Sequence, residues 1–107
     1  MKTTVTLLAA AAAIFAAGAH AADAKNAEAL AKASGCFACH TMDKKLIGPG
    51  LKEIADKYRK DQNAEANLIK KVKEGGKGVW GDIPMMPNAH LKDEDIKTLV
   101  QWILSIK

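Results

Sequence analysis

The two cysteines of the chain stand three positions apart and are followed directly by a histidine, in the string Cys36-Phe37-Ala38-Cys39-His40. This C-x-x-C-H spacing is the pattern of c-type haem attachment. Each thiol can add across a haem vinyl group to form a thioether, and two intervening residues let the pair reach both vinyl groups. The next residue then lies over the iron, where its imidazole can be an axial ligand. The string therefore predicts one covalently bound haem c whose iron is held by His40.

Two other chemistries use the same residue types. A C-x-x-C pair can be a thiol–disulfide redox centre, but that motif usually accompanies a βαβ pattern, and no stretch of this sequence alternates with the period of a strand. Zinc needs four tetrahedral ligands, and Cys36, Cys39 and His40 lie too close together to close a tetrahedron, with His90 as a distant fourth. We therefore expect haem and keep the dithiol and the zinc site as alternatives.

The ligand on the other face of the iron decides between an electron carrier and a haem catalyst or gas sensor. Four residues are candidates: Met42, Met85, Met86 and His90. Met42 follows His40 too closely to reach the opposite face. Met85 and Met86 lie between two prolines, which stiffen the loop and reduce the entropy lost on ligation. A thioether from either would complete a six-coordinate iron suited to one-electron transfer.

Four short helices are expected to position these residues. Apolar residues recur at helical spacing over residues 27–34, 51–58, 64–74 and 93–106. Gly35 ends the first helix, Asn63 is placed to cap the third, and Asp93 opens an acidic first turn that suits the dipole of the last. Residues 75–91 are rich in glycine and proline and predict a long loop. The predicted fold class is all-α.

The first 21 residues have the pattern of a secretory signal peptide. Lys2 precedes an apolar run over residues 5–17, and small residues stand at positions 19 and 21. The run is shorter than the roughly 20 residues that a membrane-spanning helix needs. We expect cleavage after Ala21, which leaves one domain over residues 22–107 in the periplasm, without stable membrane insertion.

Size limits what the chain can do alone. It has 107 residues, 49% of them hydrophobic and 26% charged, with a formal net charge of +4. This excludes a multidomain protein and an enzyme with a large pocket made from protein alone. A mature domain this small buries little surface and is marginal without help. We expect haem to supply the missing core, and the chain without haem to be largely unfolded.

The sequence resembles the small bacterial monohaem class I cytochromes c, of the c-551/c-552 type. The resemblance covers residues 25–107 and rests on the haem motif together with five further landmarks. These are Gly48-Pro49, Gly78-Val79-Trp80-Gly81, Ile83-Pro84-Met85, Pro87-Asn88 and Trp102-Ile103-Leu104-Ser105. The family implies four helices wrapped around one haem, an electron-transfer role rather than catalysis, and shuttling to a terminal reductase or oxidase, of the nitrite reductase or cytochrome oxidase type.

The resemblance also implies roles for single residues. Cys36, Cys39 and His40 match the thioether cysteines and the proximal ligand. Met85 matches the ligand methionine, because it directly follows Ile83-Pro84, whereas Met86 stands where the family usually has proline.

The remaining matches surround the ligands. Pro49 matches a proline whose carbonyl accepts the ring N–H of the ligand histidine, which fixes the tautomer. Trp80 matches an indole that approaches a haem propionate, and Asn88 an asparagine near the ligand sulfur. Lys71 stands where some relatives have an arginine near a propionate, but lysine lacks the bidentate fork.

Partners are expected to be redox proteins. In this family the thioether edge near Cys36, Phe37 and Ala38 is the usual site of electron entry and exit, and lysines around it can steer an acidic partner. Nucleic acid is excluded by the compartment and by the lack of a groove-reading motif. We expect a monomer.

Overall fold

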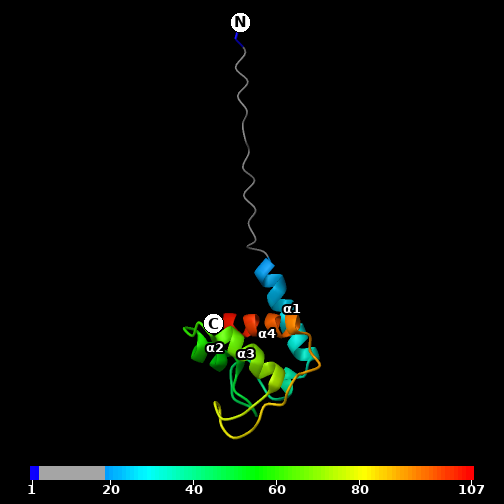
Figure 1. Cartoon of the computed structure of the whole chain (residues 1–107), viewed down its shortest axis with the longest axis vertical. Coiled ribbons are helices and arrows are strands. Elements are labelled where there is room, and N and C mark those ends of the chain that lie inside the picture. The colour runs from blue at the N-terminus through cyan, green and yellow to red at the C-terminus, as the bar shows by residue number, and fades with distance from the viewer. Residues whose placement is uncertain (3–18) are drawn as a thin grey trace.

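The computed structural model describes residues 1–2 and 19–107, which contain four α-helices and one short 3-10 helix. They are α1 (Ala19–Ala33), η1 (Cys36–Ala38), α2 (Leu51–Tyr58), α3 (Ala64–Glu74) and α4 (Asp93–Ser105). The expected all-α domain of four short helices is confirmed (Figure 1). The apolar run of the expected signal peptide, residues 5–17, lies outside the described residues. Within those residues, no helix combines the length and apolar character needed to cross a membrane.

The last helix, α4, is the one against which the others pack. Its side chains Ile96, Leu99 and Val100 are at most 1% exposed, and α1, α2 and α3 all contact it (Figure 1). They recur at positions i, i+3 and i+4, so they form one apolar stripe that faces the core. Each buried side chain of this kind contributes about 1.5–3 kcal/mol. The three residues belong to the apolar repeat that predicted a helix over residues 93–106.

The first helix is longer than predicted, because it begins at Ala19 instead of Ala27. Four of the eight added residues are alanine, the strongest helix former, so local propensity extends the helix beyond its apolar face. Ala27 and Ala31 are 1% exposed, and their small side chains let α1 lie close to α4. The helix ends before Gly35, as expected, where φ is +82°.

The middle helices match their predicted spans, but one cap does not. Asn63 precedes α3, yet its side chain makes no capping hydrogen bond. Its φ and ψ are −94° and 1°, whereas a capping side chain needs an extended backbone to reach the first turn. The predicted cap is therefore wrong. At the start of α2, the carboxylate of Glu53 instead accepts a hydrogen bond from the Gly50 N–H at 3.0 Å.

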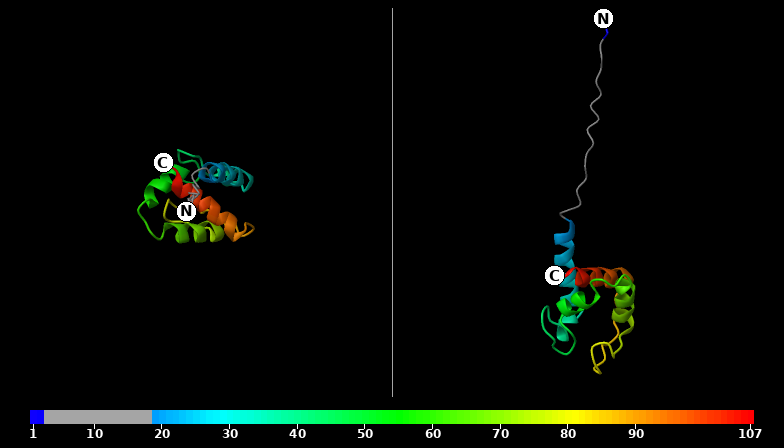
Figure 2. Two further views of the ribbon diagram at one scale, coloured as in Figure 1. Left: turned by 90° about the horizontal axis from the view of Figure 1, so that it is seen from above. Right: turned by 90° about the vertical axis from the view of Figure 1, so that its left-hand side faces the viewer.

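Two arms extend from α4 and face each other (Figure 2, right). One arm contains η1, residues 39–50 and α2, and the other contains α3 and the loop over residues 75–92. The predicted long loop is confirmed, and it is closed at its base by Gly76 and Met85. The Gly76 N–H donates to the Met85 carbonyl at 3.1 Å, and the Met85 N–H donates to the Gly76 carbonyl at 2.8 Å.

Candidate functional site

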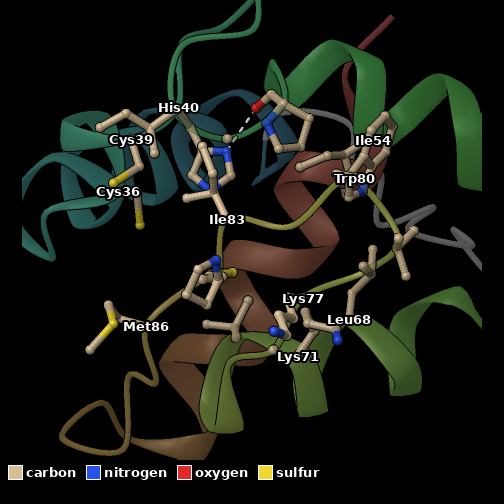
Figure 3. A pocket seen from close by; sticks show the side chains of 18 of the residues that line it. Cys36, Cys39, His40, Ile54, Leu68, Lys71, Lys77, Trp80, Ile83 and Met86 are labelled. Atoms are coloured by element: carbon tan, nitrogen blue, oxygen red, sulfur yellow. Dashed lines mark hydrogen bonds between the residues drawn. The ribbon is translucent and has the colours of Figure 1, made fainter.

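The C-x-x-C-H string forms a tight turn directly after α1. The backbone N–H groups of Cys39 and His40 both donate to the carbonyl of Cys36, at 3.2 and 3.0 Å. Gly35 allows this reversal because its φ of +82° lies in the region that glycine favours. The turn brings Cys36, Cys39 and His40 to one wall of a cavity (Figure 3).

The imidazole of His40 is held by the next segment of the chain. Its Nδ1 lies 2.7 Å from the carbonyl oxygen of Pro49 (dashed line in Figure 3). A carbonyl can only accept, so Nδ1 carries the proton and Nε2 keeps its lone pair for a metal ion. Hydrogen bonding by the second ring nitrogen also raises the basicity of a ligand histidine.

Gly48 lies against the flat face of this ring. A Cβ built on Gly48 would be 2.7 Å from Cε1, 3.0 Å from Nδ1 and 3.3 Å from Nε2 of His40. Real Cβ atoms do not approach other atoms this closely, so any larger residue must push the imidazole aside. The glycine therefore sets the position of the ring as much as the hydrogen bond to Pro49 does.

We predict that Gly48→Ala displaces His40, weakens its bond to Pro49 and costs about 1–3 kcal/mol of stability, as overpacking of a well-packed core does. NMR of the His40 ring and denaturant unfolding would measure both effects. Gly78→Ala is the control, because nothing lies within 4 Å of its Cβ, although its φ of +107° strains any other residue. It should lower stability without moving the His40 signals. Unchanged His40 signals in Gly48→Ala would contradict the prediction.

A cavity of about 700 Å³ separates the two arms. This is within the range of about 300–1,000 Å³ that is typical of cofactor sites. One wall carries the haem motif and α2, the opposite wall carries α3 and the long loop, and α4 closes the top. The three α-helices of these walls supply apolar lining: Leu51, Ile54, Leu68, Val72, Leu99, Val100 and Ile103.

Several large apolar side chains at the rim of this cavity are exposed to solvent. Five of them line the cavity and are 40–72% exposed: Ile47, Val79, Trp80, Ile83 and Met86. Several exposed apolar side chains around one cavity are typical of a binding site. A flat apolar macrocycle would cover these side chains while the thiols of Cys36 and Cys39 and the free nitrogen of His40 reach it from one wall. The residues present therefore fit haem c.

Met85 and Met86 differ in how they are held. The two backbone hydrogen bonds to Gly76 fix Met85, and its side chain is half-buried in the cavity lining. Met86 also lines the cavity, but it is 72% exposed, and in Figure 3 its side chain extends away from His40. Of the two methionines, Met85 therefore has the backbone held by hydrogen bonds and the less exposed side chain.

The other expected site residues also meet at the cavity. Trp80, Asn88 and Lys71 all line it. The side-chain nitrogen of Asn88 donates to the carbonyl of Val72 at 3.1 Å, so here the amide fastens the loop to the end of α3. A contact between Asn88 and a ligand sulfur therefore stays a prediction, as does one between Trp80 and a propionate.

The state of the two thiols gives little support to a thiol–disulfide redox centre. Cys36 and Cys39 are both free, and burial raises the pKa of the Cys36 thiol, against a smaller lowering by a backbone hydrogen bond. Dithiol redox enzymes need the opposite, a thiol of lowered pKa.

The zinc alternative needs three or more His, Cys, Asp or Glu side chains around one point, and residues 1–2 and 19–107 contain no such group. His90 is exposed and is not part of the cavity lining.

Sequence reasoning missed three contributors to the site. Gly48 entered the sequence analysis only as part of the Gly48-Pro49 landmark, and only the packing reveals its contact with His40. Lys77 lines the cavity beside Lys71 (Figure 3), although a lysine between two glycines gives no signal of this. Lys57 reaches the ring of Trp80 from α2, a contact between residues 23 positions apart.

Comparison with known proteins agrees with this geometry. The family model described as Cytochrome c matches residues 24–107. The chain belongs to the cytochrome c family. It is 46% identical to cytochrome c-552 of Nitrosomonas europaea over the full length of both proteins. It is 49% identical to cytochrome c-551 of Allochromatium vinosum over 77 residues, 72% of this chain and 82% of that protein.

The fold is that of class I cytochromes c. The crystal structure of Nitrosomonas europaea cytochrome c552 superposes with a TM-score of 0.72 at 48% identity, covering 75% of this chain and 99% of that one. Membership of the cytochrome c family implies one covalently attached haem c with its iron, for which the chain has the two cysteines. Cytochromes c transfer electrons and are not enzymes, so the prediction that this chain is not an enzyme is confirmed.

Proposed function

We propose that this cytochrome c is a periplasmic one-electron carrier whose iron is held by His40 and Met85. The observation that carries the proposal is the cavity itself. The motif residues, with the free nitrogen of His40, line one wall, and the half-buried Met85 lines it from the other arm. When bound, the haem iron supplies a one-electron couple. If His40 and Met85 both hold the iron, no position would stay open for a substrate.

Each residue has a separate task in this proposal. Cys36 and Cys39 attach the haem, and Pro49 orients His40. Met85 supplies a soft sulfur, which favours ferrous iron and raises the reduction potential. The remaining cofactor-binding residues complete the site: Trp80 donates its indole N–H toward a propionate, and Asn88 keeps the loop of Met85 in place. Because the protein would supply both iron ligands, little rearrangement accompanies electron transfer.

The partners are redox proteins that dock where the haem edge meets solvent. Cys36 and Phe37 are half-buried, and Ala38 and Cys39 are exposed, so the thioether edge near them is accessible. Nearby lysines suit an acidic partner in a short-lived complex. We infer that the chain acts as a monomer between a respiratory donor and a terminal nitrite reductase or cytochrome oxidase.

The proposed compartment follows from the sequence. We infer that residues 1–21 are removed during export and that residues 22–107 form the mature domain. The described helices contain no candidate membrane span.

Carbon monoxide binding distinguishes this function from a haem enzyme or gas sensor. The ferrous protein at neutral pH is expected not to bind carbon monoxide, because Met85 occupies the position that the gas would take. Rapid binding at micromolar carbon monoxide would instead show an open iron and would reject the electron-carrier proposal. A protein without any haem spectrum, but with a titratable dithiol, would point to the redox-enzyme alternative.

A further inference from the structure

Lys57 connects two aromatic rings at the mouth of the cavity. Its Nζ lies 5.7 Å from the centre of the Tyr58 ring and 5.6 Å from the centre of the Trp80 ring. Both distances are within the roughly 6 Å at which a cation is attracted to an aromatic face. Tyr58 is its neighbour on α2, whereas Trp80 belongs to the long loop on the other arm.

The carboxylates on α2 and just after it have partners other than this ammonium group. Among the residues that the structure describes, Lys57 takes part in no ion pair. Glu53, one turn before it, accepts a hydrogen bond from a backbone N–H at 3.0 Å. Asp56 accepts from two other basic side chains at 3.1 and 2.9 Å, and Asp61 accepts from a backbone N–H at 2.8 Å. The acidic residues of α2 and of the turn after it therefore have other partners, and the contacts recorded for the Lys57 ammonium group among the described residues are those with the two rings.

The contact of Lys57 with the two rings lies at the edge of the cavity. Tyr58 and Trp80 both line the cavity, but Lys57 does not, so the lysine contacts the rings from outside the lining. Trp80 is 40% exposed, and the loop between Gly76 and Met85 has little else to hold its tip. A contact from α2 to Trp80 thus spans the opening between the two arms.

We propose that Lys57 is a positioning residue, whose ammonium group on the rings of Tyr58 and Trp80 fastens the loop arm of the cavity to α2. Its role in holding the wall of a haem cavity rests on the proposed function. A cation–π contact at an exposed position shifts an opening equilibrium about two- to fivefold. Loss of the contact should therefore increase the population of the open state, in which Trp80 is released from α2, by that factor.

The test uses the ferrous holoprotein, in which the exchange rates of the two indole N–H protons are measured by NMR. In Lys57→Met the Trp80 signal should shift, and its exchange should become about two- to fivefold faster. Trp102, on α4, is the internal reference and should not change. Lys57→Arg should restore the wild-type values, because a guanidinium also stacks on aromatic rings.

Lys60→Met is the matched control, since it removes the same charge just beyond α2, where the described residues give it no aromatic contact or ion pair. The proposal is overturned if Lys57→Met and Lys60→Met leave Trp80 equally unchanged, or if Lys57→Arg fails to rescue. The visible spectrum of the same samples reports haem ligation separately, so a failure of the proposed function is distinguishable.

Discussion

Replacing Met85 with alanine is expected to turn a ferrous protein that does not bind carbon monoxide into one that binds it. The substitution removes the sulfur that we assign to the iron. Met86 cannot take its place, because the backbone of Met85 is pinned to Gly76 by two hydrogen bonds of 2.8 and 3.1 Å. The reduction potential should fall as well, since a thioether favours ferrous iron and axial ligation tunes haem potentials over roughly 0.8 V.

Met86→Ala is the control for this experiment. Met86 is 72% exposed, so its loss should leave the visible spectrum, the gas binding and the potential close to those of the wild type. Carbon monoxide titration and potentiometry measure both variants. If Met86→Ala opens the iron and Met85→Ala does not, the ligand is the other methionine.

Preventing haem attachment is expected to unfold most of the domain. Without haem, the cavity of about 700 Å³ and the exposed apolar side chains at its rim would stay in contact with water, so the domain would lose a large part of its apolar burial. A whole domain of this size is stable by only about 5–15 kcal/mol. The double variant Cys36→Ala, Cys39→Ala, purified without haem, should lose most of its helical circular dichroism.

Single-cysteine variants provide the graded comparison. Cys36→Ala and Cys39→Ala each keep one thioether and both iron ligands, so they should stay folded with reduced stability. A helical signal close to that of the holoprotein in the haem-free double variant would contradict the view that the porphyrin supplies the core.

Much of this architecture could be predicted because the signals are local. Cys36 and His40 define the chemistry by spacing alone, and the stripe of Ile96, Leu99 and Val100 is an uninterrupted helical period. The long loop follows from its glycines and prolines, whose backbone preferences do not depend on distant contacts. Family resemblance then pointed to the hydrogen bond between His40 and Pro49, which the structure contains.

The features that sequence reasoning missed depend on contacts between distant segments or on local competition. The closeness of Gly48 to the imidazole appears only when residues 41–50 fold back over His40. The contact between Lys57 and Trp80 forms only when α2 and the long loop are both folded, because each supplies one of the two residues. Asn63 has the right residue type for a cap, but its backbone geometry prevents the bond. The early start of α1 reflects alanine propensity, which a search for apolar periodicity does not register.

The most direct test of the account is the visible spectrum of the exported protein, recorded oxidised and then reduced. His40 and Met85 on opposite faces of one haem predict low-spin spectra in both states and a weak sulfur-to-iron charge-transfer band in the oxidised state. That band should disappear in Met85→Ala and persist in Met86→Ala. A high-spin spectrum of the wild-type protein would contradict the account. It would mean that no methionine sulfur coordinates the iron and that the iron is open to an external ligand.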